Sequence, residues 1–186
     1  MELAGADDAV DAIAAAWRRE LPYVSVDSIG IVTRVWHIAK LLGDDRAQLL
    51  RAHGVDMATL DLLSTLRRRG QPYRMTTREL AAASLITAGA ITQRVDRAER
   101  QGLVKRTSRH DSRAVDVELT PHGYAVADDV VAAVLERESE LLSGLRADQQ
   151  QQLAGTLRLL LQHLAAVLGD RRKPRHVGHA PDEEPG

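Results

Sequence analysis

Arginine and lysine gather in the middle of the chain, where their density could serve recognition of a polyanion. Between Leu66 and Arg113 the sequence has twelve Lys or Arg and only four Asp or Glu, although the whole chain carries a net charge of −1. A basic segment of this kind is the electrostatic footprint of nucleic-acid binding. A solvated helix surface would carry the same charges, so the segment alone leaves both interpretations open.

The residue types that other chemistries require are missing or scattered. The chain has no cysteine, which excludes disulfides, thiolate zinc sites and cysteine nucleophiles. The seven histidines show no helical i, i+4 pairing and no metal motif, and we find neither a nucleophile motif nor a phosphate-binding loop. The sequence therefore argues against an enzyme, a metal sensor and a bound cofactor.

The basic segment predicts a helix-turn-helix followed by a hairpin. Thr76 and Glu79 have the capping-box spacing and open a short helix through about residue 84. Thr87 can cap a longer helix over 88–101, which stops at Gly102. The segments 103–107 and 114–119 then form a two-stranded hairpin around a polar tip, since apolar residues in the second segment alternate with Asp116 and Glu118.

The helix over 88–101 has two different faces. At 100° per residue, Ile91, Val95 and Ala98 fall on one side, which we expect to face the core. Arg94 lies on the flank of that inward side. The remaining polar positions point elsewhere and suit base edges and phosphates: Thr92, Gln93, Arg97 and Arg100.

Amphipathic helices are expected on both sides of this lobe. Apolar residues at helical spacing predict helices over 8–21, 28–53 and 57–69 before it, and over 121–142 and 148–168 after it. The apolar stripe of the first helix includes Trp17. The second has so wide an apolar face that we expect burial on two sides, and the last two have apolar faces suited to partner helices.

The elements combine into a mainly α fold with a small β-hairpin wing, a winged helix-turn-helix with a helical dimerisation region. We expect N-terminal helices over 1–55, the winged lobe over 56–120, dimerisation helices over 121–168 and a disordered tail over 169–186. The acidic N-terminus lacks the pattern of a signal peptide, and no apolar run approaches the roughly 18 residues of a membrane span. We therefore expect a cytoplasmic, nucleoid-associated protein with no membrane partner.

Three stretches carry a resemblance to a known family. They read LDLLSTLRRRG over 60–70, TTRELAAASLITAGAITQRVDRAERQGLVKR over 76–106 and DSRAVDVELTP over 111–121. They resemble the MarR family of bacterial regulators, and the resemblance extends over essentially residues 28–168. It implies a homodimeric transcriptional repressor, with an interface built from the first and last two family helices, that binds a palindromic operator in double-stranded DNA.

The resemblance also assigns the wing. Family members carry an Asp-x-Arg motif in which the arginine enters the minor groove and the aspartate helps to hold the wing, and Asp111 and Arg113 match it. The wing departs from the usual form, since Arg109 and His110 replace an acidic, Pro-rich lead-in. The expected DNA-binding residues are Thr87, Gly89, Thr92, Gln93, Arg97, Arg109, Asp111 and Arg113.

A narrower resemblance concerns a small-molecule effector. Trp17 lies on a helix added before the usual family core, and with Asp61, Arg68 and Arg94 it resembles the urate-responsive, PecS-type branch. That resemblance implies that the four residues surround a purine anion such as urate, whose charge disturbs Arg94 so that DNA is released. Structural roles stay open for each of the four: Trp17 in the core, Asp61 and Arg68 in solvent, and Arg94 bound to phosphate or to Asp61.

Two other functions remain open from the sequence. A regulator of the same family could sense phenolic or antibiotic-like compounds, with the four residues purely structural. A helical adaptor could instead use its basic middle segment to bind an acidic protein.

Overall fold

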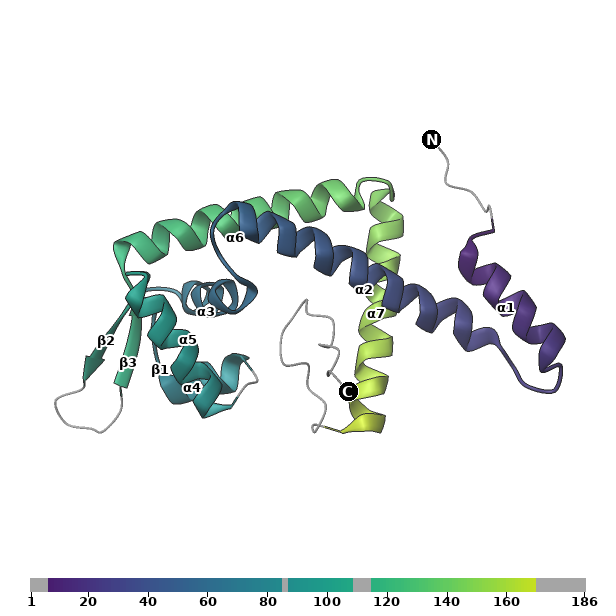
Figure 1. Cartoon of the computed structure of the whole chain (residues 1–186), viewed down its shortest axis with the longest axis horizontal. Coiled ribbons are helices and arrows are strands. Elements are labelled where there is room, and N and C mark those ends of the chain that lie inside the picture. The colour runs from purple at the N-terminus through teal and green to yellow at the C-terminus, as the bar shows by residue number, and fades with distance from the viewer. Residues whose placement is uncertain (1–6, 85–86, 109–114, 170–186) are drawn as a thin grey trace. The chain divides into compact units, whose positions relative to one another are not determined.

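The computed structural model describes residues 7–84, 87–108 and 115–169 (Figure 1). Two compact units divide the chain, one within Met1–Arg46 and the other within Ala47–Val177. The long helix α2 (Asp27–Ala52) runs from the first unit into the second. All helices expected from the sequence are present, with bounds within a residue or two of the expected ones.

In the first unit, a charged cluster ties the start of α1 (Ala9–Glu20) to α2. Asp8 caps α1 by accepting from the backbone of Val10, and the Asp11 carboxylate accepts from the backbone of Asp8 in return. The guanidinium of Arg34 donates to Asp8 at 2.9 Å and to Asp11 at 2.7 Å, and it also donates to the carbonyl of Gly30. The hydrogen bond from Arg34 is the main reason that the pKa of Asp8 falls to about 2.

The apolar stripe expected on α1 is only partly buried. Val10 and Ala14 are buried, whereas Ile13 and Trp17 are exposed, so Trp17 is not a core residue within this chain. The wide apolar face of α2 is also uncovered in the single chain, where Leu50 is the buried residue of the helix. The exposed large apolar residues of α2 are Ile31, Val32, Val35, Trp36, Ile38, Leu41 and Leu42.

The second unit contains the winged lobe. Its helices are α3 (Met57–Arg68), α4 (Thr77–Ser84) and α5 (Ala88–Arg100), and its strands are β1 (Arg74–Thr76), β2 (Val104–Ser108) and β3 (Val115–Leu119). Asp56 caps α3 by accepting from the backbone of Thr59, and Thr76 and Glu79 make the expected reciprocal capping-box bonds. Leu62, Leu66, Leu80 and the inward residues of α5 and the sheet make one core.

The wing is a three-stranded antiparallel sheet in the order β1-β3-β2, so the expected two-stranded hairpin was incomplete. Strand β1 was missed because three residues are too few to show a period of two. Asp116 faces away from Val117 on β3, yet it is only 2% exposed. It lies in register with Thr76 of β1 and Thr107 of β2, and its carboxylate is 3.7 Å from Arg74.

Two long helices follow the wing. Thr120 caps α6 (Pro121–Leu142), which packs Val130 and Val134 against Leu50, Val55 and Leu60 in a second apolar cluster. Helix α7 (Ala147–Leu168) is leucine-rich, but none of its residues is buried in the single chain. Neither α7 nor any other helix in the described part of the chain is long and apolar enough to cross a membrane.

Candidate nucleic-acid interface and effector site

Helix α5 is anchored along one side and open along the other. Ile91, Val95 and Ala98 are at most 1% exposed and belong to the main core of the lobe, as the helical periodicity predicted. Thr87 caps the helix through a hydrogen bond from the backbone of Ala90. The opposite side presents exposed residues at Thr87, Gly89, Thr92, Gln93, Arg97 and Arg100.

The two acidic residues of α5 form ion pairs with the wing. Arg106 of β2 forms ion pairs with Asp96 at 2.5 Å and with Glu99 at 2.7 Å, and its backbone N–H also donates to Glu99. Arg106 thus offsets part of the negative charge of α5, whose exposed basic residues are Arg97 and Arg100. Sequence reasoning missed this role of Arg106, since a strand residue gives no sign of which helix it will pair with.

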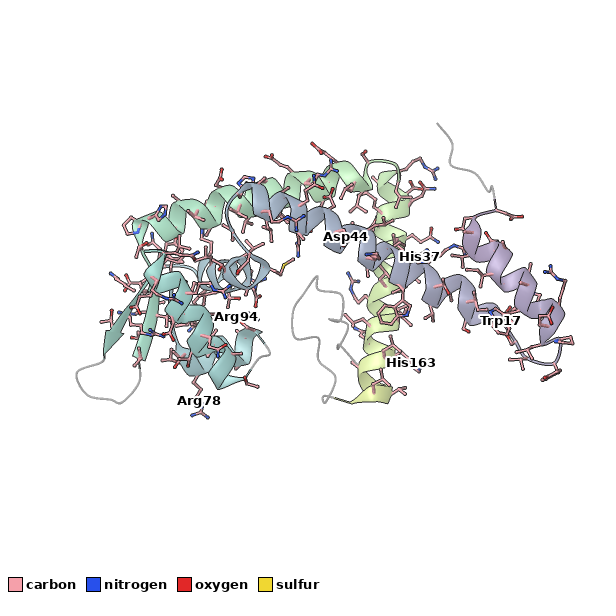
Figure 2. All side chains as sticks on the ribbon, in the orientation of Figure 1. Trp17, His37, Asp44, Arg78, Arg94 and His163 are labelled. Atoms are coloured by element: carbon pink, nitrogen blue, oxygen red, sulfur yellow. The ribbon has the colours of Figure 1, made fainter. Side chains whose placement is uncertain are left out.

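Two arginines of α5 form ion pairs with α3. Arg94 donates to Asp61 at 2.7 Å, and the two side chains are only 10% and 20% exposed. Figure 2 shows Arg94 on the side of α5 that faces α3. Arg97 pairs with Asp56, the cap residue of α3, and these side chains are 56% and 46% exposed. The inner pair is therefore largely closed to solvent, whereas the outer pair is open.

The structure brings together two of the four residues expected to bind an effector, Asp61 and Arg94. Arg68 lies two turns beyond Asp61 on α3; it is exposed, and it donates to the side chain of Thr65 at 3.2 Å. Trp17 belongs to the first unit, where its side chain on α1 is 48% exposed.

The expected wing-tip contacts Arg109, Asp111 and Arg113 lie outside the described residues. Other arginines of the lobe are described and exposed, among them Arg69, Arg74 and Arg78. Figure 2 shows Arg78 extending away from α4. The positive surface of this lobe therefore includes more than the helix over 88–100.

A cluster around Arg67 joins α3 to α6 and was not foreseen. Arg67 donates to Asp128 at 2.6 Å and to the hydroxyl of Tyr124 at 3.1 Å. Its guanidinium carbon is 4.7 Å from the ring centre of Tyr124 and 5.2 Å from that of Tyr73, within cation–π range. The hydrogen bond from Arg67 lowers the pKa of Asp128, so the pair stays charged at neutral pH. The partners are too far apart in sequence for any local pattern to reveal them.

Comparison with known proteins agrees with this architecture. A sequence profile of the MarR family matches residues 53–114. The HTH-type transcriptional regulator PecS of Dickeya dadantii (strain 3937) is 28% identical over 156 residues, which are 83% of this chain and 94% of that protein.

Solved structures share the fold. AbsC, a MarR family transcriptional regulator from Streptomyces coelicolor, matches with a TM-score of 0.65 at 21% identity, over 77% of this chain and 98% of that one. Wild-type MarR from E. coli matches with a TM-score of 0.58 at 26% identity, over 70% and 96%. A MarR mutant from E. coli complexed with operator DNA matches with a TM-score of 0.60 at 24% identity, over 78% and 97%.

The described lobe has the helix-turn-helix and three-stranded wing of these relatives, and the sequence match runs beyond the lobe into the flanking helices. The outward side of α5 exposes Arg97 and Arg100, and the core anchors its other side. The matched lobe and the shared fold identify a MarR-type DNA-binding transcriptional regulator.

Proposed function

We propose that this regulator is a homodimeric repressor that reads a palindromic operator with α5 and the wing, and that a small purine anion such as urate releases it from DNA. The observation that carries the proposal is the arrangement of α5. Its apolar side is locked in the core, its acidic residues are bound by Arg106, and its polar side is open to a duplex groove.

For the DNA contact, Thr92, Gln93 and Arg97 have the side chains that reach base edges or phosphates from a helix in the major groove. Gly89 and Thr87, at the start of α5, let the backbone approach the duplex closely. Arg109, Asp111 and Arg113 are assigned to the wing tip by family resemblance. The E. coli MarR mutant complexed with operator DNA, which has this fold, supports a duplex as the partner.

The homodimer is supported by apolar surface that a single chain leaves uncovered. On α7, Leu153, Leu157, Leu161, Leu164 and Leu168 are all exposed and fall within about 80° of one another around the helix. So large an apolar stripe marks an interaction surface. A second copy of the chain is the natural occupant, because a two-fold dimer also places two recognition helices about one DNA turn apart.

The effector proposal rests on the Arg94–Asp61 pair. A guanidinium held by one carboxylate in a shielded position can pair with a planar anion. Trp17 and Arg68 are assigned to this site by family resemblance alone. An anion that takes Arg94 from Asp61 would disturb α5 directly, since Arg94 is part of that helix. Release of DNA requires the anion to bind the DNA-incompetent state more tightly.

Urate binding is tested by isothermal titration of the wild-type dimer, of Arg94→Ala and of Arg78→Ala. We expect a binding heat with the wild type and with Arg78→Ala, whose exposed arginine on α4 is the matched control, and none with Arg94→Ala. An uncharged purine should bind weakly or not at all. A sensor of phenolic compounds would instead give no urate heat with any of the three proteins.

DNA binding is tested by mobility shift and footprinting on the DNA upstream of the gene, with and without urate. We expect a palindromic footprint that urate removes. Absence of any shift at low salt would refute the DNA-binding role and favour the adaptor, whereas a footprint that urate leaves intact would refute the effector alone.

A further inference from the structure

The two ion pairs between α3 and α5 differ in how easily the arginine can leave its carboxylate for another anion. Arg94 and Asp61 are nearly closed to solvent, so their separation leaves a shielded charge without its partner. Arg97 and Asp56 are about half exposed, and ion pairs of that kind are weak. A competing anion from outside the protein, such as a DNA phosphate, can therefore displace Asp56 from Arg97 at a small cost in free energy.

Asp56 uses its two oxygens for two separate tasks. Oδ1 accepts from the backbone N–H of Thr59 at 2.7 Å and caps α3, while Oδ2 pairs with Arg97. Partial burial acts to raise the pKa of Asp56, but hydrogen bonds from Thr59 and Arg97 outweigh it and hold the pKa below its ordinary value. Asp56 is thus ionised at neutral pH, and Arg97 is already compensated before any DNA arrives.

We propose that Asp56 is an intramolecular competitor for DNA, which holds Arg97 in the free protein and must release it to a phosphate when α5 enters the groove. This inference rests on the proposed function, in which Arg97 contacts the duplex. It makes Asp56 a residue that lowers operator affinity without touching DNA. The capping role does not require a charge, because Asn and Ser cap helices about as well as Asp.

The test uses the full-length dimer and a palindromic duplex that the wild type selects from a random library. Asp56→Asn keeps the capping oxygen and removes the charge, and Asp56→Ser is a second variant that does the same with a shorter side chain. We expect either variant to bind about two- to fivefold more tightly per lobe, the range that a weak exposed ion pair allows. The number of phosphate contacts, and with it the dependence of affinity on salt, should stay about the same, because Arg97 reaches the phosphate in both proteins.

Two comparisons separate the ion pair from a general change of charge. Asp129→Asn removes one negative charge from an exposed position of α6 in the same unit, and it should leave affinity nearly unchanged. In a double-mutant cycle with Arg97→Gln, Asp56→Asn should have no effect, because the group that it frees is gone.

Each outcome of these measurements supports or refutes the competitor role of Asp56. If Arg97→Gln weakens DNA binding but Asp56→Asn matches the wild type, the competitor role is refuted and the DNA-binding role of Arg97 stands. If Asp56→Asn tightens binding equally in the Arg97→Gln background, the effect is general electrostatics and the inference fails. If Arg97→Gln binds like the wild type, or the wild type selects no duplex, the proposed DNA contact fails and the competitor role fails with it.

Discussion

Gly123, in the first turn of α6, lies against the backbone of the loop before β2. A Cβ atom at this position would come 1.8 Å from the carbonyl oxygen of Leu103. That carbonyl cannot easily move, because it accepts hydrogen bonds from both the backbone and the side chain of Thr120. The glycine is therefore required by a close approach of two backbones.

Gly123→Ala should lower the free energy of unfolding by about 1–3 kcal/mol, since the backbone must shift to admit the methyl group. Gly89→Ala is the matched control: a Cβ there meets no atom within 4 Å, and alanine favours a helix over glycine by about 0.5–1 kcal/mol. Urea unfolding at one protein concentration measures both. Equal midpoints for Gly123→Ala and the wild type would contradict the close approach.

Asp61 matters for stability whether or not it takes part in effector binding. Asp61→Asn leaves the guanidinium of Arg94 shielded from solvent without its carboxylate, so we expect a loss of about 1–3 kcal/mol. Asp44→Asn removes the same charge from a pair with Lys40 whose side chains are 68% and 73% exposed, and it should cost less than about 0.5 kcal/mol. Similar losses in the two variants would show that shielding does not set the strength of the Arg94 pair.

Among helices, the start of α1 depends on Arg34 of α2. The pKa of Asp8 is about 2 in the folded protein, against an ordinary value of 3.8. A depressed pKa means that Asp8 stabilises the folded state above pH 4 and that this contribution disappears as the pH falls toward 2. Acid should therefore loosen α1 in that window.

Arg34→Gln should raise the pKa of Asp8 toward its ordinary value and reduce the acid sensitivity, because hydrogen bonding to Arg34 is the largest cause of the shift. Carbon-13 NMR titration of the Asp8 carboxyl measures this directly. Lys40→Gln removes a positive charge from the same helix without contacting Asp8, and it should leave the titration unchanged. A pKa of Asp8 that stays near 2 in Arg34→Gln would show that Arg34 is not the cause of the low value.

At the level of elements, the sequence predicted most of what local interactions control. The caps at Thr76 and Thr87 form as their residue types indicated. Strand β1 was not predicted, because its three residues become a strand only by pairing with β3. The same pairing places Asp116 between two threonines, where alternation alone would have left it in solvent.

At the scale of the whole molecule, the leucine stripe of α7 is the surface to alter in a test of the dimer. Leu157→Glu with Leu161→Glu should convert the protein to a monomer and abolish operator binding, since charge at the centre of an apolar interface is costly. Gln151→Glu with Gln162→Glu adds the same charge to the opposite side of α7 and should leave the dimer intact. Light scattering after size-exclusion chromatography gives the mass. A dimer that survives the leucine substitutions would exclude this stripe as its interface.

The sequence by itself determined the helices, their caps, the inward side of α5 and the family, because these depend on residues within a few turns of one another or on motifs in sequence order. The tertiary structure decided which charges meet. Arg97 with Asp56 and Arg67 with Asp128 join elements far apart in the chain. Such pairs depend on how elements pack and turn toward one another, and helical periodicity carries no information about the neighbour across the contact.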